Sequence, residues 1–537
     1  MSNTKFIPRL AIVSAAALLV AGCNLAPVFN KPTADAPSVF KEDASSNDKV
    51  DSKLWKPAVS LEAADKGQWW KIFNDPKLNI LEEQAAGDNQ SLKAAAARVQ
   101  EARANVRANS ADFLPNIGLG ANVSRSAPNP VTFTQQPYTL YTTQGSASYD
   151  PDLFGRAHEI EKSFFFQAEG TQATYNGVLL GLQADVAQDY FLIRALDDER
   201  QLLRQTVDIR TKEAKIMSER FERGDVGAQD DANARSDLAS AQADLSGLDR
   251  QRATLEHSLA ILLGQSATSF SMADSPLADV PPAIPGGIPS TVLERRPDIA
   301  AAIDAMQSAN QSIGAAKSAF YPDLSLTAAA GVESTALNSL FKWSSRAWAL
   351  GQVGALALTM PIFDNGRHTA ELDEARAAYD ESVANYRQAV LTAFKEVEDG
   401  LSDQHFLYRQ WDQAREAAEQ ASRATYLVQK RYDLGDVDFF EVVTTQRTSL
   451  AAEEAAVQLR GQRFVATVNL IRALGGGWEE GTASAATTTP VAAPADTTQQ
   501  PAAPVAPANA PDASQQPTTP AVAPATPAAT ASTPATK

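Results

Sequence analysis

The heptapeptide RFERGDV at residues 220–226 returns as RYDLGDV at residues 431–437. The glycines of the two copies, Gly224 and Gly435, are 211 residues apart. The same offset relates Gly155 to Gly366 and Gly264 to Gly475. The segment ADFLP at 111–115 matches SAFYP at 318–322 with an offset of 207, so a loop differs in length between the copies. Ordered markers at a fixed spacing predict an internal duplication.

A very long helix is predicted before each copy of the heptapeptide. No proline occurs between Arg156 and Arg223, and apolar residues recur there every three or four positions. From Tyr379 to Leu401, the second copy has a heptad-like apolar pattern, which predicts coiled-coil packing. At about 1.5 Å per residue, a helix from Gly366 to Asp433 is roughly 100 Å long. Such a helix extends well beyond an ordinary globular core.

Strands are predicted directly after the prolines of the other marker, Pro115 and Pro322. Apolar and polar residues alternate from Asn116 to Ser124 and again from Asp323 to Glu333. Partner strands are expected near Leu140–Tyr149 and Ala347–Met360, where the alternation is weaker, as is usual in outer-membrane barrels. Each half is therefore predicted to contain a helix, two strands around a loop, a very long helix, a tight turn and a returning helix.

The alternating strands fit either a barrel with lipid outside and water inside, or a soluble sandwich buried on one face. Two hairpins that each lead into a helix of about 100 Å cannot form a compact sandwich, which favours the barrel. Four strands cannot close a transmembrane barrel, because about eight is the minimum. The predicted fold is therefore mainly α with transmembrane β-strands, and its barrel is shared between subunits.

The first residues predict export and lipidation. Lys5 and Arg9 precede an apolar run too short to span a bilayer, as in a signal peptide. The run ends in LVAGC at 19–23, which resembles the lipobox of bacterial lipoproteins, so Cys23 is the expected lipidation site. The alternative is a stray thiol after an ordinary signal peptide. Cys23 is the only cysteine, which excludes an intramolecular disulfide, and Asn24 after it favours the outer membrane.

Six segments follow from these signals. They are a lipoprotein signal peptide at 1–22, a lipidated extended segment at 23–67, a first repeat at 68–264, a proline-rich linker at 265–296, a second repeat at 297–475 and a tail at 476–537. The tail is rich in Ala, Pro and Thr and has no periodic apolar face, so it is predicted to be disordered.

The composition argues against several functions. The chain has 47 Lys plus Arg against 64 Asp plus Glu, a net charge of -17 that makes nucleic-acid binding unlikely as a general role. Its four histidines are scattered without metal-ligand spacing, and we find no phosphate loop or nucleophile elbow. We therefore expect no enzyme activity, no metal and no cofactor beyond a covalent lipid on Cys23.

Three further motifs carry a family resemblance: WWKIF at 69–73, YDPDLFG at 149–155 and LERRPDI at 293–299. With the duplicated plan, the region from Trp69 to Leu474 resembles the TolC-like outer membrane factor family, in its efflux lipoprotein branch. The resemblance implies a homotrimer whose three sets of four strands form a twelve-stranded barrel, continued by a periplasmic α-helical barrel. It also implies a periplasmic adaptor and a proton-driven inner-membrane transporter as partners, in the outer membrane of a Gram-negative bacterium.

The two tight turns are the expected periplasmic tips of this helical barrel. Glycine ends each long helix, and the resemblance implies that the tips contact the adaptor. The expected tip residues are Gly224, Asp225 and Val226 in the first copy and Gly435, Asp436 and Val437 in the second.

The resemblance also places a constriction at the start of the returning helix. Its acid falls on Glu441, and Asp230 is the first-copy equivalent, while the family's second acid is replaced by Thr444. The further gate candidates are Asp231, Asp436 and Asp438. A carboxylate ring in a narrow pore favours cations. Alternatively, these acids cap helices and solvate an exposed end.

Pro297 and Asp298 are predicted to start a helix, and Arg295 and Arg296 to form structural ion pairs. Two other functions stay open. One is a TolC-like duct for protein secretion, and the other is a lipid-anchored coiled-coil protein that spaces the envelope. The lipobox and the ERRPD run at 294–298 favour efflux over secretion, and the predicted strands argue against the scaffold.

Overall fold

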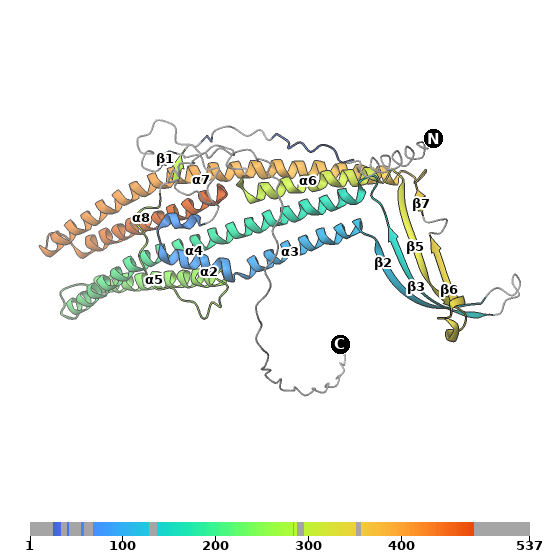
Figure 1. Cartoon of the computed structure of the whole chain (residues 1–537). Coiled ribbons are helices and arrows are strands. Elements are labelled where there is room, and N and C mark those ends of the chain that lie inside the picture. The colour runs from blue at the N-terminus through green and yellow to red at the C-terminus, as the bar shows by residue number, and fades with distance from the viewer. Residues whose placement is uncertain are drawn as a thin grey trace, which may run out of the picture. The chain divides into compact units, whose positions relative to one another are not determined.

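A computed structural model describes residues 25–33, 40–41, 55–57, 68–127, 137–282, 284–286, 295–350 and 356–476. The predicted signal peptide, the predicted lipidation site Cys23 and the tail beyond residue 476 lie outside these ranges. The fold is mostly helical (Figure 1). Its helices are α2 (Pro76–Asp88), α3 (Gln90–Ser110), α4 (Arg156–Glu222), α5 (Ala228–Leu262), α6 (Pro297–Ser318), α7 (Arg367–Asp433) and α8 (Phe439–Ala473).

The two halves of the chain contain equivalent helices. Helices α4 and α7 each have 67 residues, and α5 and α8 each have 35. The predicted helix up to Asp433 is confirmed, as is its counterpart in the first half. Glycine begins both long helices in the left-handed conformation, with φ 75° at Gly155 and 83° at Gly366. Most L-residues avoid this conformation, so the recurring glycine has a local backbone reason.

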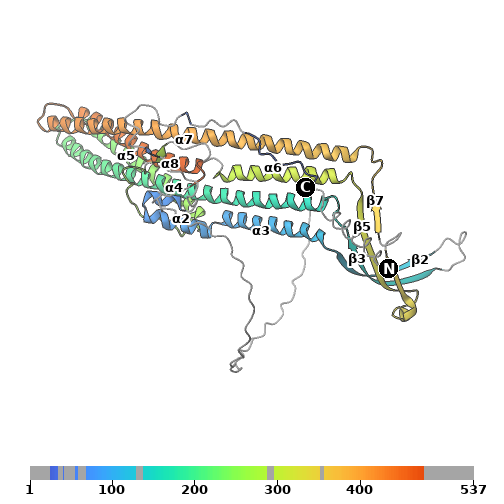
Figure 2. The same ribbon diagram turned by 45° about the horizontal axis from the view of Figure 1, so that its top comes forward.

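The long helices pack side by side, and the tight turns lie at the end away from the strands (Figures 1 and 2). Their buried contacts join α4, α6, α7 and α8 around residues such as Tyr190, Val397 and Leu470. Two glycines allow close approach of these helices. A Cβ on Gly461 would lie 2.6 Å from that of Ala195, and a Cβ on Gly400 would lie 3.0 Å from Cδ1 of Leu470. Small residues at such contacts let helix backbones approach closely.

The WWKIF motif forms a short helix directly before α2. Trp69–Phe73 is a 3-10 helix, and Trp69 and Trp70 are buried. Asp75 then caps α2, because its side chain accepts hydrogen bonds from the backbone N–H groups of Lys77 and Leu78. Asp75 also accepts a short hydrogen bond from the hydroxyl of Tyr190 on α4. One acid therefore both starts a helix and ties it to the long one.

The strands form one antiparallel sheet. They are β2 (Asn116–Ser126), β3 (Tyr138–Tyr149), β5 (Asp323–Ser334), β6 (Arg346–Leu350) and β7 (Leu356–Thr359). The order is β2-β3-β5, and both β6 and β7 pair with β5. The hairpins of the two halves are thus joined through the β3–β5 pair, in which Ala147 lies opposite Ala328.

The fourth strand differs from the prediction. One strand was expected across Ala347–Met360, but two segments pair with β5. Leu350 lies opposite Ala328 and Leu356 lies opposite Leu326, so four more residues separate the segments than regular pairing needs. Extra residues in one strand interrupt its ladder and bend it. This interruption explains why the alternation was weak in this part of the sequence.

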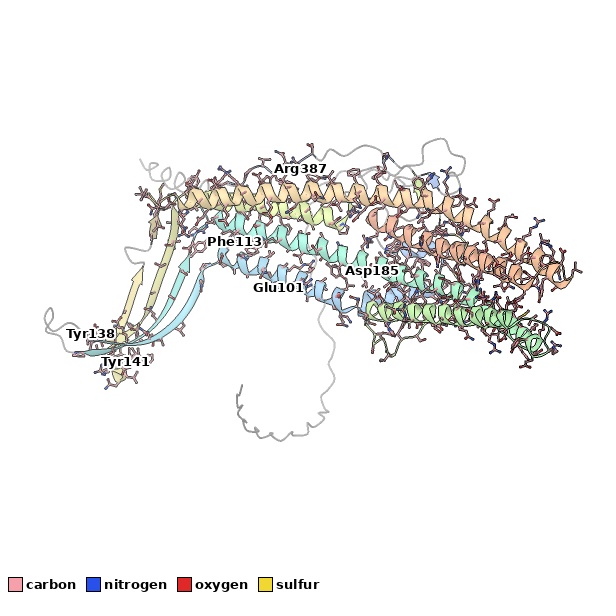
Figure 3. The ribbon with its side chains drawn as sticks, turned by 180° about the vertical axis from the view of Figure 1, so that it is seen from behind. Glu101, Phe113, Tyr138, Tyr141, Asp185 and Arg387 are labelled. Atoms are coloured by element: carbon pink, nitrogen blue, oxygen red, sulfur yellow. The ribbon has the colours of Figure 1, made fainter. Side chains whose placement is uncertain are left out.

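In Figure 3, Phe113 lies where α3 leads into β2, and Tyr138 and Tyr141 lie at the far end of β3. Strand β2 is exposed along its whole length, and its apolar residues Ile117 and Leu119 are 81% and 84% exposed. A separate two-stranded parallel sheet pairs β1 (Trp55–Pro57) with β4 (Ile284–Gly286), which the sequence did not predict. Among the described residues, no helix has the length and hydrophobicity needed to cross a membrane.

Candidate functional site

The two tight turns have the same backbone geometry. Gly224 and Gly435 adopt φ of 80° and 78° directly after α4 and α7. Each glycine N–H bonds to the carbonyl three residues earlier, and the next N–H bonds to the carbonyl five residues earlier, from Asp225 to Arg220 and from Asp436 to Arg431. This is the Schellman motif, which satisfies the last carbonyls of a helix. The predicted helix-ending glycines are confirmed.

The returning helices begin with acids that bond to the backbone. The side chain of Asp438 accepts a 3.0 Å hydrogen bond from the N–H of Glu441 and caps α8. In the first half, Asp230 accepts from the N–H of Gly227 at 3.3 Å. These contacts supply acceptors for N–H groups that lack a partner within the helix, as the capping alternative requires.

The remaining candidate acids pair with arginines. Arg431 approaches Asp436 at 2.8 Å and Glu441 at 3.4 Å, and Asp231 lies 3.1 Å from Arg235. Side chains of the Arg431 pairs are about half exposed, so solvent screens both ion pairs and they add little stability. Glu441 thus makes only a weak ion pair beside the turn, and its carboxylate stays in contact with solvent.

Side chains also tie the two hairpins together within one chain. Arg220 donates a 2.8 Å hydrogen bond to the hydroxyl of Tyr432, and Gln446 donates a 2.7 Å bond to Glu213. Burial raises the pKa of Glu213, and the bond from Gln446 opposes that rise. These contacts were not predicted. A signal existed in the repeat, because Phe221 of the first copy is replaced by Tyr432, which gains a hydroxyl.

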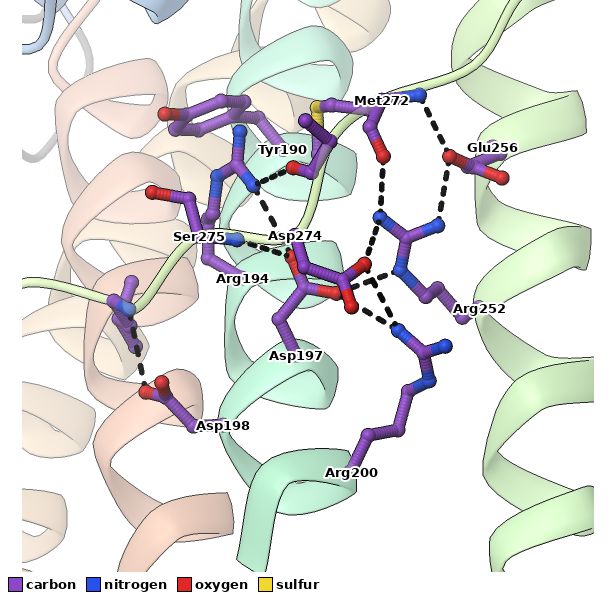
Figure 4. A network of polar contacts seen from close by, with 12 residues as sticks. Tyr190, Arg194, Asp197, Asp198, Arg200, Arg252, Glu256, Met272, Asp274 and Ser275 are labelled. Carbon is purple, nitrogen blue, oxygen red and sulfur yellow. Dashed lines mark hydrogen bonds and ion pairs between the residues drawn. The ribbon is translucent and has the colours of Figure 1, made fainter. Parts of the chain in front are cut away.

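A larger polar network lies farther along the helices (Figure 4). Asp197 on α4 accepts hydrogen bonds from Arg194, Arg200 and Arg252, and from the backbone N–H of Ser275. Arg252 belongs to α5, and Ser275 lies in the segment that follows α5. The Asp197 side chain is only 3% exposed. A buried carboxylate needs this many donors, since an unpaired charge there is costly.

A second ion-pair group starts α6. Pro297 is the first residue of the helix, and Arg296 before it pairs with Asp298 at 2.8 Å and with Glu396 of α7 at 2.7 Å. Arg296 also donates to the carbonyl of Ala473 at the end of α8. Its neighbours raise the pKa of Arg296, although burial works against the rise, so the guanidinium stays charged. The predicted ion-pair role of Arg296 is confirmed, as are the helix start at Pro297 and the position of Asp298 in the first turn. The N-cap of α6 is Arg296, and it makes no side-chain cap hydrogen bond.

Within the described ranges, no group of three or more His, Cys, Asp or Glu side chains is placed to hold a metal ion. The candidate acids are divided between the two turns, with Asp225, Asp230 and Asp231 at one and Asp436, Asp438 and Glu441 at the other. The geometry therefore offers charged helical ends and an open sheet, which suit a conduit and its contacts.

Residues 81–265 and 288–476 match the model of a family described as outer membrane efflux protein. Among similar proteins, the outer membrane protein OprJ of Pseudomonas aeruginosa is 30% identical over 87% of this chain and 95% of its own length. The cation efflux system protein CusC of Escherichia coli is 30% identical over 89% of this chain and 100% of its own.

Solved structures of outer-membrane channels are also similar to this chain. The CmeC outer membrane channel of Campylobacter jejuni is 26% identical, with a TM-score of 0.78 over 85% of this chain and 96% of that one. The outer-membrane channel OprN matches with 25% identity and a TM-score of 0.75, over 85% of this chain and 100% of its own.

Proposed function

This chain belongs to the outer membrane efflux protein family, and we propose that three copies of it assemble into one continuous duct. The chain is an outer-membrane component of an efflux system and belongs to a family of channel proteins. We accordingly expect no enzyme activity. In the proposed assembly, each copy contributes four strands, with β6 and β7 counted as one, to a twelve-stranded barrel. The helices continue that barrel through the periplasm.

The open sheet is the observation that carries this proposal. Within the described part of one chain, its outer strands, β2 on one side and β6 with β7 on the other, have unpaired edges. Unpaired edges and exposed apolar residues such as Leu119 are unfavourable unless another chain and lipid cover them. Pairing the β2 edge of one copy with the β6–β7 edge of the next gives both edges a partner and closes the barrel after three copies. Lipid around the barrel then covers apolar residues such as Leu119.

The helical part follows from an internal duplication. The equal lengths of α4 and α7 and of α5 and α8 support two equivalent hairpins per chain. Three copies then supply six similar hairpins around one axis. Their tips, at Gly224–Val226 and Gly435–Val437, are the proposed docking points for a periplasmic adaptor.

The start of α8 is the proposed periplasmic gate. Trimerisation brings three copies of Glu441 to one axis, with Asp230, Asp231, Asp436 and Asp438 nearby as further candidates. A ring of carboxylates favours cations over anions and resists close approach of its members. The capping contacts of Asp438 and Asp230 favour a structural role for these two, which leaves Glu441 as the main candidate.

Lipidation of Cys23 and the partners complete the proposal. We propose that cleavage before Cys23 leaves a lipid-anchored N-terminus in the outer membrane. The duct then receives substrates from an inner-membrane transporter through the adaptor. Relatives of about 30% identity are named for toluene, cations and pyoverdine. We therefore assign the choice of substrate to the transporter.

Cross-linking in native outer membranes tests the trimer. A lysine-reactive cross-linker at increasing dose should give a ladder that ends at three processed chains, each lighter than the 57.2 kDa full-length chain by the removed signal peptide. A ladder that ends at two chains, or no ladder at any dose, contradicts the shared barrel.

The proposed tips need a separate test. A photoreactive residue at Leu434, which is exposed beside the second turn, should cross-link to the adaptor. The same residue at Ile80 on α2, also exposed but outside the turns, is the matched control. Equal adaptor cross-linking from both positions would contradict docking at the tips.

A further inference from the structure

The connection between β5 and β6 has a defined shape of its own. Residues 337–345 contain two short 3-10 helices. The hydroxyls of Ser334 and Ser339 share a 2.6 Å hydrogen bond, and the hydroxyl of Ser345 donates a 2.7 Å bond to the carbonyl of Ser339. Leu340 is buried inside the turn. The serine contacts therefore order this connection instead of leaving it an open loop.

The ordered turn exposes its largest side chains. Leu337 is 64% exposed, Phe341 81% and Trp343 78%. Ordering a loop costs conformational entropy, and burial of apolar side chains is the usual compensation for that cost. Here the apolar side chains face outward, and exposed apolar groups held together in this way mark a contact surface.

Cations accompany these apolar side chains. Lys342 and Arg346 are exposed, and the guanidinium carbon of Arg346 lies 2.9 Å from the ring centre of Trp343, as in a cation–π contact. Among the residues that the structure describes, neither cation lies within ion-pair distance of a carboxylate. Arg125, near the end of β2, is also exposed.

The surrounding sequence is poor in acids, although the whole chain has a net charge of -17. Residues 113–149 contain no Asp or Glu, and neither do residues 334–363. The nearest acid in sequence, Glu333, lies opposite Thr142, which in turn lies opposite Asn122. That face of the sheet is the one that the proposed barrel turns to water. The other face is therefore locally positive in an acidic protein.

The strand register places Arg346 on the apolar face. Arg346 lies opposite Val332 on β5, and Val332 lies opposite Thr143 on β3. Thr143 lies opposite Ala121, which shares a face of β2 with Leu119. Since β5 leads away from α6, the turn lies at the end of the sheet farthest from the helices, at the same end as the labelled tyrosines (Figures 1 and 3).

We propose that this turn binds a phosphate-bearing lipid of the outer leaflet. Its members, here called the rim site, are Leu337, Phe341, Lys342, Trp343 and Arg346. The ammonium and guanidinium groups donate hydrogen bonds to phosphate oxygens, while the exposed rings contact the apolar part of the lipid. Apolar side chains beside the cations favour a lipid over a free anion. The inference rests on the proposed barrel, which puts this end of the sheet at the outer leaflet.

Binding of lipid A to the purified lipidated protein tests the rim site. Native mass spectrometry from an uncharged detergent gives the number of bound lipid molecules and their dissociation constant. The double substitution Lys342→Gln and Arg346→Gln removes both cations of the rim site. The matched control is Lys212→Gln with Lys215→Gln on α4, which removes two exposed cations outside the sheet.

We expect lipid A to bind the rim-site variant at least about tenfold more weakly than the wild type, because each cation near a lipid surface adds to the attraction. The control should stay within about twofold of the wild type, since its charges lie far from the bound phosphate. Lipid A without its phosphates should bind the wild type about tenfold more weakly, and the rim-site variant should not distinguish the two lipids.

Inorganic phosphate separates a lipid site from a site for free anions. Added in large excess, it should displace little lipid A from the wild type, because it makes no apolar contact with Trp343 and Phe341. Complete displacement would show a simple anion site and contradict the assignment to a lipid.

Equal binding by the rim-site variant and the control, or equal affinity of the wild type for lipid A with and without phosphates, would overturn the proposal. The mass and the single-channel conductance of the same preparation separate this result from failure of the duct. Phosphate-independent binding by a conducting trimer rejects the rim site alone. Phosphate-dependent binding by a non-conducting single chain rejects the duct and leaves the rim site intact.

Discussion

The carboxylate of Asp197 joins α4, α5 and the segment after α5 through three arginines and one backbone amide. Asp197→Asn removes the charge but keeps the shape. It takes from the buried Arg194 the carboxylate with which it pairs, while Arg200 and Arg252 keep their ion pairs with Asp249, Asp274 and Glu256. We expect a loss of about 3–5 kcal/mol in unfolding free energy. Asp249→Asn is the control, because Asp249 is half exposed and pairs only with Arg200 in this network, so its loss should be about 1 kcal/mol or less. Urea unfolding followed by circular dichroism measures both. Similar losses for the two variants would contradict the central role of Asp197.

Glu82 on α2 makes stability depend on pH. Its side chain is fully buried, neither oxygen has a hydrogen-bond partner among the described residues, and burial raises its pKa well above the ordinary 4.5. Below pH 4.5 the group is protonated in both states, and its contribution is fully present. As the pH rises toward the folded-state pKa, only the folded form keeps its proton, so stability falls.

The substitution Glu82→Gln should remove this pH dependence. The variant and the wild type should unfold at similar temperatures near pH 4, and the variant should be the more stable protein at pH 7. Thermal unfolding across this range measures the difference. A variant that is less stable at pH 7 than at pH 4, by the same margin as the wild type, would show that Glu82 is not the cause.

Glu441 tests the gate proposal at the residue scale. Glu441→Gln removes three carboxylates from a trimer, so the preference for cations over anions should fall by about twofold or more. Asp225→Asn at the first turn is the control, and we expect it to leave selectivity near that of the wild type. Reversal potentials in a salt gradient measure the preference. An unchanged cation preference in Glu441→Gln would contradict a role of Glu441 in the gate.

Sequence reasoning at this scale found the local contacts and missed the distant ones. The helix start at Pro297 and the turn glycines depend on neighbours within a few residues, so a single sequence is enough to predict them. The bond from Arg220 to Tyr432 joins residues 212 positions apart. Such a pair depends on how two hairpins pack, which no local pattern encodes.

At the scale of elements, strand β2 offers a comparison within one strand. Ile117 and Leu119 alternate with Gly118 and Gly120, and Asn122 lies on the same face as the glycines. In the proposed barrel the first face meets lipid and the second meets water.

Leu119→Arg should therefore destabilise the assembled channel by about 2–4 kcal/mol if it lies near the middle of the bilayer, whereas Asn122→Arg should be tolerated. The fraction of trimer that withstands detergent at increasing temperature measures the effect. Equal sensitivity of the two variants would contradict the assignment of the faces.

The helices were predictable because their signals are long and redundant. Over 67 residues, a period near 3.6 and the absence of proline outweigh any local irregularity, and the glycines mark both ends. The sequence did not predict that the fourth strand is divided into β6 and β7. Segments of five and four residues are too short for their alternation to reveal a change of register.

At the scale of the whole molecule, the predicted duplication agrees with the equal lengths of the paired helices, and the proposed assembly depends on surfaces that several copies would complete. Among the described residues, the two edges of the sheet have no partner strand, and the candidate acids of one chain lie apart at two turns. The sequence alone predicted that strands must be shared. It could not predict the distance between Glu441 side chains of different copies, because that distance depends on how the copies pack in the proposed trimer.

Single-channel recording of the purified, lipidated protein in planar bilayers, with its mass in detergent determined on the same preparation, tests the central claim most directly. The shared duct predicts a mass of three chains and discrete conductance steps that favour cations. A single chain without conductance would contradict the duct and favour a lipid-anchored protein that only spaces the envelope.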